Sequence, residues 1–392
     1  MNIEQPLRQL FGVPAKPGLV ALPLGPGHWH ILFAGGERPL LLPVGDIRLQ
    51  QRSLSYFVPA GWKSLYGRTL LLMNSVAPAA RLLPECRLPE GTLGFLSGRL
   101  PFSQPSHSAI QIGRAGPNQK AAMLLLTERG DGLALAKISM LPAADPQVTV
   151  EARWLSELAA VPELENRVPR LLTEGLALTN RRYLVTTIAP ATGTTKAFTP
   201  AHAAFLGALG RAGSDVMSFT ASPCFQHLEK TLARLEPQLT RHERAVLQAV
   251  LRECRLHLAG WTGPFVTAHG DFVPWNIRVH ADEIFVFDWE HARRGANPLA
   301  DALNYFVMQR AVYARAIGSR FLVATMRRVE ALARQLYPEW TWRAGVVSAL
   351  GLAYLLQVLL DYSVAGRTLA RAHPVVAGYM GLMEERSAWM AV

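Results

Sequence analysis

Short apolar runs separated by turn-forming residues dominate the middle of the chain, and they predict strands. Ala109–Gly113 alternates between apolar and polar side chains, and two longer apolar runs, 121–127 and 133–139, flank the glycine-containing turn 129–132. A further run, 183–188, is rich in β-branched residues. The pattern predicts a small antiparallel sheet within residues 101–190.

From residue 191 onward the apolar spacing follows the period of a helix. Three segments are typical of amphipathic helices: 205–209, 228–235 and 242–258. The stretch Ala344–Leu360 is nearly uncharged, but it is shorter than the ~20 residues that cross a bilayer and it contains Ser348 and Gln357. We therefore expect residues 191–392 to be mainly helical, with this stretch as a buried helix and no transmembrane segment. Peripheral membrane contact through the neighbouring Arg and Trp side chains is the alternative.

The first hundred residues are rich in proline, glycine and leucine. Trp29–Phe33 and Pro39–Pro43 are predicted as short strands joined at the turn Gly35-Gly36, and 64–76 is predicted as a helix. Residues 1–100 could form a recognition domain for an extended or polymeric acceptor, or a structural cap packed on the sheet region. We favour the cap.

The candidate chemistry lies between residues 265 and 290, in three pieces: His269-Gly270-Asp271, Asn276 and Asp288-Trp289-Glu290. A buried strand expected at 265–267 leads into the first piece. A hairpin of 277–280 and 283–287 would place Asn276 and Asp288 at adjacent strand ends, where both can converge on one cation. Amide and carboxylate oxygens suit Mg²⁺, and phosphoryl transfer from a metal-nucleotide needs positioning and charge neutralisation. A metal hydrolase is the rival interpretation of His-x-Asp, but no second His-rich cluster follows.

These motifs resemble the aminoglycoside phosphotransferase and choline kinase family, which has the protein-kinase-like fold. The family pattern is His-Gly-Asp, four residues, Asn, and later Asp-Trp-Glu or a near variant, and Gly295, Pro298 and Asp301 match its continuation. The resemblance covers residues 105–310 well and the last eighty or so weakly. It implies that Asp271 is the catalytic base and that Asn276 and Asp288 are metal ligands. Supporting roles then fall to His269, Glu290 and Asp301, the last of which would brace the catalytic loop.

The resemblance also assigns a nucleotide site to the sheet region. Lys137 lies inside an apolar strand, as does the phosphate-gripping lysine of kinases, which pairs with a glutamate on the next helix. Glu151 is the first choice for that partner and Glu157 the second. The backbone near Thr187 and Ala189, where the chain would cross between lobes, is expected at the adenine edge.

The turn Gly113–Lys120 contains Gly116 but lacks the full Gly-x-Gly-x-x-Gly pattern. Two interpretations of this turn stay open, a backbone cradle for phosphates and an ordinary hairpin turn.

Charge restricts the partners. The formal net charge is +11, which favours anionic partners: a nucleotide, phosphorylated or acidic sugars, or a membrane surface. Aminoglycosides are polycations, whereas residues 301–392 hold six acidic side chains against ten arginines. We therefore do not expect an aminoglycoside acceptor. Nucleic acid is not expected either, because no Arg/Lys run with interleaved aromatic residues occurs.

The remaining features indicate a cytoplasmic protein. The three cysteines, Cys86, Cys224 and Cys254, form no metal or redox motif, and no signal peptide pattern opens the chain.

The sequence thus predicts a two-lobed α+β kinase-like fold. Residues 1–100 are expected as an extra region, 101–190 as the small lobe and 191–392 as the large lobe. The predicted function is transfer of the γ-phosphoryl group of ATP, with Mg²⁺, to a hydroxyl of a small molecule such as a sugar. GTP is an alternative donor, and a pseudokinase or a lipid-linked or polymeric acceptor are alternative functions. A protein kinase is disfavoured because its Asp-Phe-Gly and Ala-Pro-Glu landmarks are missing.

Overall fold

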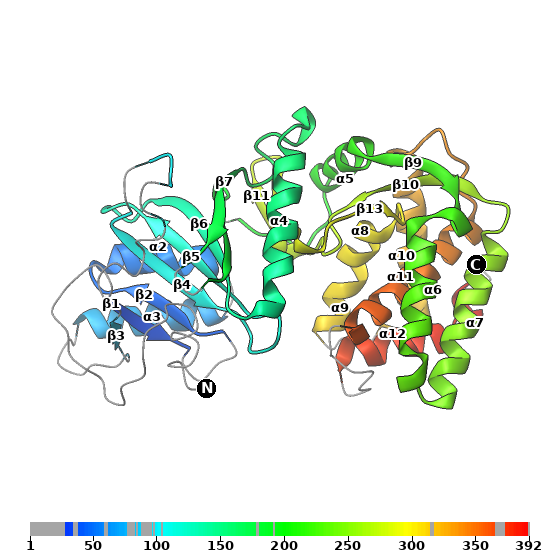
Figure 1. Cartoon of the computed structure of the whole chain (residues 1–392), viewed down its shortest axis with the longest axis horizontal. Coiled ribbons are helices and arrows are strands. Elements are labelled where there is room, and N and C mark those ends of the chain that lie inside the picture. The colour runs from blue at the N-terminus through cyan, green and yellow to red at the C-terminus, as the bar shows by residue number, and fades with distance from the viewer. Residues whose placement is uncertain are drawn as a thin grey trace. The chain divides into compact units, whose positions relative to one another are not determined.

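The structure is a computed structural model, and its internal contacts divide the chain into two units (Figure 1). The first comprises Met1–Thr194 and Arg278–Glu290, and the second comprises Thr195–Ile277 and His291–Val392. The residues that the structure describes are 28–33, 38–58, 62–76, 83, 85–87, 96, 99–102, 105–177, 180–190, 193–313, 317–364 and 373–390.

An antiparallel sheet of eight strands, in the order β3-β1-β2-β4-β5-β6-β8-β7, forms the centre of the first unit. The strands are β1 His28–Leu32, β2 Leu40–Pro43, β3 Glu85–Arg87, β4 His107–Ile112, β5 Lys120–Leu126, β6 Gly132–Ser139, β7 Leu171–Leu176 and β8 Arg182–Thr186. The strands expected from the sequence at 109–113, 121–127, 133–139 and 183–188 are confirmed as β4, β5, β6 and β8. The predicted turn at Gly35-Gly36 lies outside the described residues.

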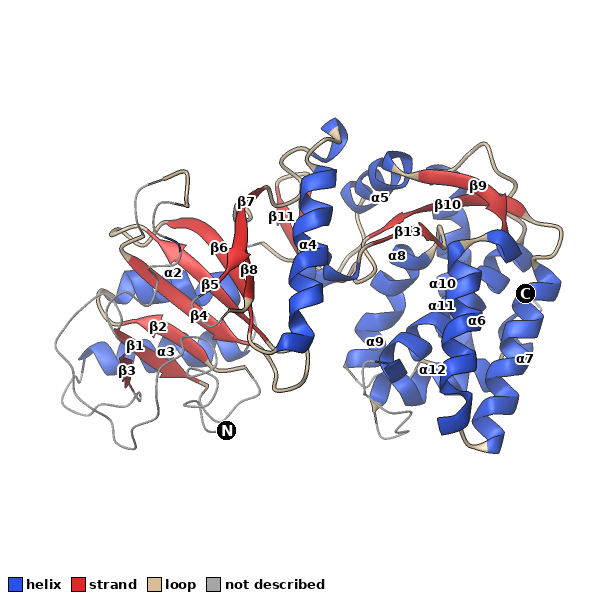
Figure 2. Cartoon of the chain, viewed as in Figure 1, coloured by secondary structure: helices blue, strands red, loops and turns tan. Residues whose placement is uncertain are grey.

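Both faces of this sheet are buried, because consecutive side chains of each strand point to opposite faces. Ile110, Met123 and Leu125 pack in one apolar cluster, while Leu124 and Leu126 pack in the other. Helices α2 (Ile47–Phe57) and α3 (Trp62–Val76) lie along the second face (Figure 2) and contribute Leu49, Leu54 and Leu71. The N-terminal residues therefore both extend the sheet and cover it.

This arrangement differs from the three expected regions. Residues on both sides of position 100 share one sheet, since β2 pairs with β4. The unit boundary falls after Thr194 rather than at 190. The hairpin Arg278–Glu290, expected in the large lobe, belongs by its contacts to the first unit, because Val279 bridges to Gly193 and the Val286 N–H donates to the Arg167 carbonyl at 2.9 Å.

The first unit also carries helix α4 (Asp145–Leu158) and the two-stranded hairpin of β11 (Ile277–His280) and β12 (Glu283–Val286). Helix α4 begins with a proline in its first turn and buries an apolar face against β8, where Val148 and Ala152 contact Leu184. The hairpin turns at Ala281, whose φ is 50°. Short 3-10 turns η3 (Pro142–Ala144) and η4 (Pro162–Leu164) flank α4.

The second unit is mainly helical, with one antiparallel sheet in the order β13-β10-β9. Its elements are α5 Pro200–Ala212, β9 Ser214–Ser218, η5 Phe219–Ala221, α6 Pro223–Leu235, η6 Glu236–Gln238, α7 Arg241–His257, β10 Thr262–Ala268, η7 Pro274–Asn276, β13 Arg293–Ala296, α8 Ala300–Leu303, the π-helix η9 Asn304–Met308, α9 Gln309–Val312, α10 Ser319–Leu336, α11 Ala344–Val364, α12 Pro374–Glu384 and α13 Ser387–Met390. Turn η8 (Trp289–His291) spans the unit boundary. The three predicted helices are confirmed within α5, α6 and α7.

Within the described residues, Ala344–Ser363 of α11 is the one helix that could cross a membrane by length and composition. Its environment is that of a core helix, because 72% of the most apolar window is buried and α11 packs on α6, α7 and α12. The buried helix expected from the sequence is therefore found, and it is longer than predicted.

Candidate active site

The loop after β10 turns sharply at Gly270. Strand β10 is buried and delivers His269, Gly270 and Asp271 to the loop. Gly270 has φ of +81°, and a Cβ at this position would overlap the carbonyl oxygen of His291. Only glycine combines this conformation with so close a contact.

Asp301, at the start of α8, braces this loop. Its Oδ2 accepts the His269 N–H at 2.7 Å, and its Oδ1 accepts the Gly270 N–H at 2.9 Å. Burial raises the pKa of the Asp301 carboxyl to about 6, although these two hydrogen bonds favour the charged form. Burying this carboxylate costs free energy, and the two backbone hydrogen bonds offset part of that cost.

Asp271 and Asn276 lie together on the loop. The Asn276 Nδ2 donates to the Asp271 Oδ2 at 2.8 Å and to the Asp271 carbonyl at 3.0 Å. The fully buried His269 accepts the Asp271 N–H at Nδ1, at 3.2 Å, so it supports the loop from within. The amide nitrogen of Asn276 is directed at Asp271, so the Oδ1 of Asn276 is the atom that could coordinate a metal ion.

In the first unit, Lys137 on β6 bridges two carboxylates. Its Nζ lies 2.5 Å from Glu151 Oε2 on α4 and 2.7 Å from Asp288 Oδ1. Burial by itself would lower the pKa of Lys137, but the charges of Asp288, Glu151 and Glu290 outweigh it and raise the pKa. Lys137 is thus a fixed, permanently charged group.

The structure brings Glu151, and not Glu157, to Lys137. Glu151 is 3% exposed, whereas Glu157 lies on the outer face of α4, 3.8 Å from Arg153. Of the two sequence candidates, the first is the partner and the second is a surface residue.

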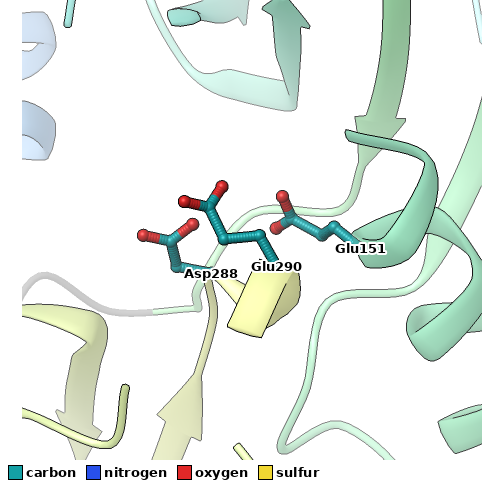
Figure 3. A group of neighbouring side chains, drawn as sticks. All are labelled: Glu151, Asp288 and Glu290. Atoms are coloured by element: carbon teal, nitrogen blue, oxygen red, sulfur yellow. The ribbon is translucent and has the colours of Figure 1, made fainter. Parts of the chain in front are cut away.

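Three carboxylates lie close together, and two of them pair with this lysine. Glu151, Asp288 and Glu290 can each offer an oxygen within 4.8 Å of the others (Figure 3). A second lysine, Lys120 at the start of β5, forms an ion pair with Glu290 and donates to Gln147 Oε1 at 3.0 Å. Two ammonium groups therefore face three carboxylates, which leaves one formal negative charge in excess.

The role of Lys120 was not predicted from the sequence. Lys120 ends the glycine turn and is one of six lysines in the chain, and this scarcity is the signal that could have singled it out. Its partner is 170 positions away in the chain, so spacing could not reveal the pair.

Asp288 has φ of 75°, in the left-handed region that non-glycine residues rarely adopt. Aspartate tolerates this conformation better than most residues, yet it still costs free energy, and such strain concentrates at functional positions. The strained backbone and the sequence motif thus both point to Asp288 as a functional residue.

The glycine turn is closed by its own hydrogen bonds. The Gly113 N–H donates to the Lys120 carbonyl at 2.8 Å, and the Gln119 Nε2 donates to the Gly113 carbonyl at 2.9 Å. A Cβ on Gly113 would lie 2.6 Å from the same Lys120 oxygen, so hairpin packing explains this glycine. Gly116 has φ of +154° and open space around it. These contacts are those of a hairpin turn, and they leave a phosphate cradle untested.

The segment expected at the adenine edge follows β8. The Thr187 N–H donates to the Arg170 carbonyl, and its Oγ1 accepts the Arg170 N–H, both at 2.9 Å. The N–H of Thr187 is thus already paired with the carbonyl of Arg170, the residue just before β7. Ala189 lies two residues further, in irregular chain before Thr194.

The same stretch of chain matches a known family. The model of the phosphotransferase enzyme family (APH) matches residues 121–340, more than half of the chain. The protein belongs to this phosphotransferase family. It is therefore a nucleotide-binding kinase whose acceptor is a hydroxyl group of a small molecule. No curated protein sequence matches it at a significant level.

Solved structures share the fold of this phosphotransferase. A thermostable mutant of aminoglycoside phosphotransferase APH(4)-Ia, in a ternary complex with AMP-PNP and hygromycin B, has a TM-score of 0.50 and 16% identity, covering 77% of this chain and 98% of that one. A putative fructosamine-3-kinase from Thermobifida fusca YX-ER1 has a TM-score of 0.47 and 19% identity, covering 72% and 93%. The streptomycin–ATP complex of APH(2")-IIa has a TM-score of 0.48 and 13% identity, covering 78% and 99%. The predicted two-lobed α+β fold is confirmed.

Proposed function

We propose that this phosphotransferase moves the γ-phosphoryl group of ATP to a hydroxyl of a sugar or a sugar-containing metabolite. The observation that carries the proposal is the Lys137 ammonium bridging Glu151 and Asp288, at 2.5 and 2.7 Å. Such a lysine, kept charged and fixed, is what the phosphates of a nucleotide need.

The loop residues supply the acceptor chemistry. The acceptor oxygen attacks the γ-phosphorus, the bond from that phosphorus to the β–γ bridging oxygen breaks, and ADP leaves with the bond's electrons. The Asp271 carboxylate, oriented by the Asn276 amide, takes the hydroxyl proton. Because the transition state is loose, this proton can leave late, and Asp271 needs no raised pKa. Asp301 and His269 keep the loop in place.

The residues present fit a magnesium ion. In the first unit Asp288 offers a carboxylate, a hard donor of the kind that Mg²⁺ binds together with nucleotide phosphates. Asn276, the other ligand expected from the sequence, offers a hard amide oxygen and belongs to the second unit. When bound, the ion would neutralise charge on the phosphate oxygens. The protein's own contribution in the first unit is to hold the Asp288 carboxylate with Lys137 fixed beside it.

The charge of the second unit supports an acceptor that is not a polycation. This unit holds 20 basic and 12 acidic side chains, a net formal charge of +8 out of the +11 of the whole chain. A positive field repels aminoglycosides and attracts neutral or acidic sugars.

The test combines purified protein, Mg²⁺ and ATP or GTP with a panel of sugars, amino alcohols and nucleosides. Acceptor-dependent ADP formation that is lost in Asp271→Asn would support the proposal. Tight nucleotide binding with no turnover on any acceptor would favour the pseudokinase, or a lipid-linked or polymeric acceptor. If Asp271→Asn turned over as fast as the unchanged enzyme, Asp271 would not be the base.

A further inference from the structure

Two exposed aromatic rings lie beside the catalytic loop. Trp275, in η7 between Asp271 and Asn276, is 37% exposed, and Tyr313, after α9, is 55% exposed. Their rings meet edge to face with centroids 6.3 Å apart. Among the described residues of the second unit, the exposed large apolar side chains are Val216, Leu256, Trp275, Val312 and Tyr313. The two aromatic members of that set are therefore neighbours, and one of them belongs to the catalytic loop.

A lysine accompanies this pair. The Lys196 Nζ lies 5.6 Å from the centroid of the Tyr313 ring, within range of a cation–π interaction. The side chain of Lys196 is exposed, so its ammonium can also meet a ligand from solvent. Because a cation already occupies the face of Tyr313, the pair is poorly suited to a second cation.

The position of Lys196 is tied to the catalytic loop through Tyr305. The Tyr305 hydroxyl donates to the Ala197 carbonyl at 3.0 Å and to the Thr195 carbonyl at 3.4 Å, one on each side of Lys196. Burial raises the pKa of Tyr305, so the hydroxyl stays protonated and remains a donor. The Tyr305 ring packs against Phe272 of the loop with centroids 5.9 Å apart. Tyr305 therefore contacts both the catalytic loop and the chain segment that carries Lys196.

We propose that Trp275, Tyr313 and Lys196 form an acceptor platform that selects anionic sugars. This inference rests on the proposed function and names its substrate class. An aromatic face takes the apolar C–H face of a pyranose ring, and an ammonium takes a carboxylate or a phosphate on the same sugar. Because Trp275 belongs to the same loop as Asp271 and Asn276, a ring bound on it would lie near the residues proposed to activate its hydroxyl. The +8 charge of the unit acts in the same direction.

The experiment uses three acceptors that share one ring and differ in charge: glucuronate, glucose and glucosamine. kcat/KM is measured for each with saturating Mg²⁺ and ATP. We expect kcat/KM to be highest for glucuronate, lower for glucose and lowest for glucosamine. Lys196→Gln should lower kcat/KM for glucuronate about fivefold, the upper range of an exposed ion pair, and change glucose less than about twofold. Trp275→Leu should raise KM for all three sugars by about tenfold, since stacking is lost whatever the charge. KM for ATP should stay the same in both variants.

Matched controls separate the platform from general surface effects. Lys230→Gln removes an exposed lysine from α6, and Leu256→Ala removes an apolar side chain that is 73% exposed; neither should change the ranking of the sugars. AMP-PNP binding is measured in parallel and reports on the proposed function alone. If AMP-PNP binds but none of the three sugars is phosphorylated, the platform proposal is overturned while the kinase assignment stands. A preference for glucosamine, or an equal effect of Lys196→Gln on all three sugars, would also overturn it. No binding of AMP-PNP would instead refute the proposed function.

Discussion

Lys137 makes two ion pairs with one ammonium group, and its loss would leave Glu151 charged and buried. Glu151 is 3% exposed, so Lys137→Met should lower the free energy of unfolding by about 3–5 kcal/mol, the typical cost of breaking a buried ion pair from one side. Urea unfolding at neutral pH measures this. The double variant Lys137→Met/Glu151→Gln should recover most of the stability and none of the turnover. Recovery of turnover would show that the lysine only stabilises the fold.

Asp288 is expected to matter through its charge. Asp288→Asn keeps a residue that tolerates the left-handed backbone but removes the negative charge of the proposed metal ligand. The Mg²⁺ concentration that half-saturates AMP-PNP binding should therefore rise by about tenfold or more, comparable to the loss of a direct metal contact. Asp131→Asn, on an exposed turn of the same unit, is the control and should change nothing. An unchanged magnesium titration of Asp288→Asn would exclude it as a ligand.

At the scale of the element, the start of α5 contains a histidine where a glutamate or glutamine is usual. Thr199 is the N-cap, and the Thr199 N–H donates to the Nδ1 of His202 at 3.1 Å, which completes a capping box. His202 is fully buried among Phe198, Phe272 and Tyr305. Burial lowers the pKa of this imidazole to about 4, so the folded protein holds it neutral.

Acid should therefore weaken this helix start. Below pH 6.5 the unfolded chain binds a proton at His202 that the folded chain refuses until about pH 4, so stability falls as the pH drops through this window, by up to about 3 kcal/mol. His202→Gln keeps an acceptor for the Thr199 N–H but cannot titrate. Thermal unfolding between pH 7 and 4 should show a smaller loss for this variant than for the unchanged protein. Parallel curves would mean that His202 titrates normally.

Elements with a strong local signal could be predicted, and elements defined by distant partners could not. Helices α5, α6 and α7 follow from their amphipathic spacing, and the Lys137 strand follows from its apolar run. Helix α2 was missed although Asp46 caps it by accepting the Arg48 N–H at 2.8 Å, because the polar residues Gln50 and Ser53 share its buried face with Leu49 and Leu54. The hairpin Arg278–Glu290 belongs to the first unit because of its contacts with Gly193 and Arg167, and no local sequence pattern links these residues to the hairpin.

In the candidate site, the residue types could be predicted from the sequence, whereas the pairs that they form are seen only in the structure. Glu151 and Glu157 are equivalent by spacing from Lys137, since helix boundaries cannot be located to one turn, and only the buried face of α4 separates them. Lys120 and the platform lysine Lys196 each depend on contacts more than a hundred positions away along the chain. Such contacts are set by packing, which the sequence pattern does not encode locally.

For the whole molecule, the N-terminal residues should prove inseparable from the kinase fold. The family match begins at residue 121, yet β1–β3 extend the sheet and α2 and α3 cover one of its faces. A chain of residues 105–392 would expose the β4 edge and the apolar side chains Ala109, Leu124 and Leu126. It should be largely insoluble, as measured by soluble yield and gel filtration beside the full chain. A soluble, active fragment would instead make residues 1–104 a separate module.

The left-handed backbone of Asp288 has a consequence for selection. Glycine at this position would relieve strain of the order of 1–3 kcal/mol, which offsets part or all of the lost contact with Lys137. A library screened for heat resistance alone can therefore enrich glycine here, and the survivors would be folded proteins without the carboxylate that we propose as a ligand for the metal-nucleotide. Directed evolution of this enzyme needs an activity step in every round, because at this residue stability and catalysis pull the sequence in opposite directions.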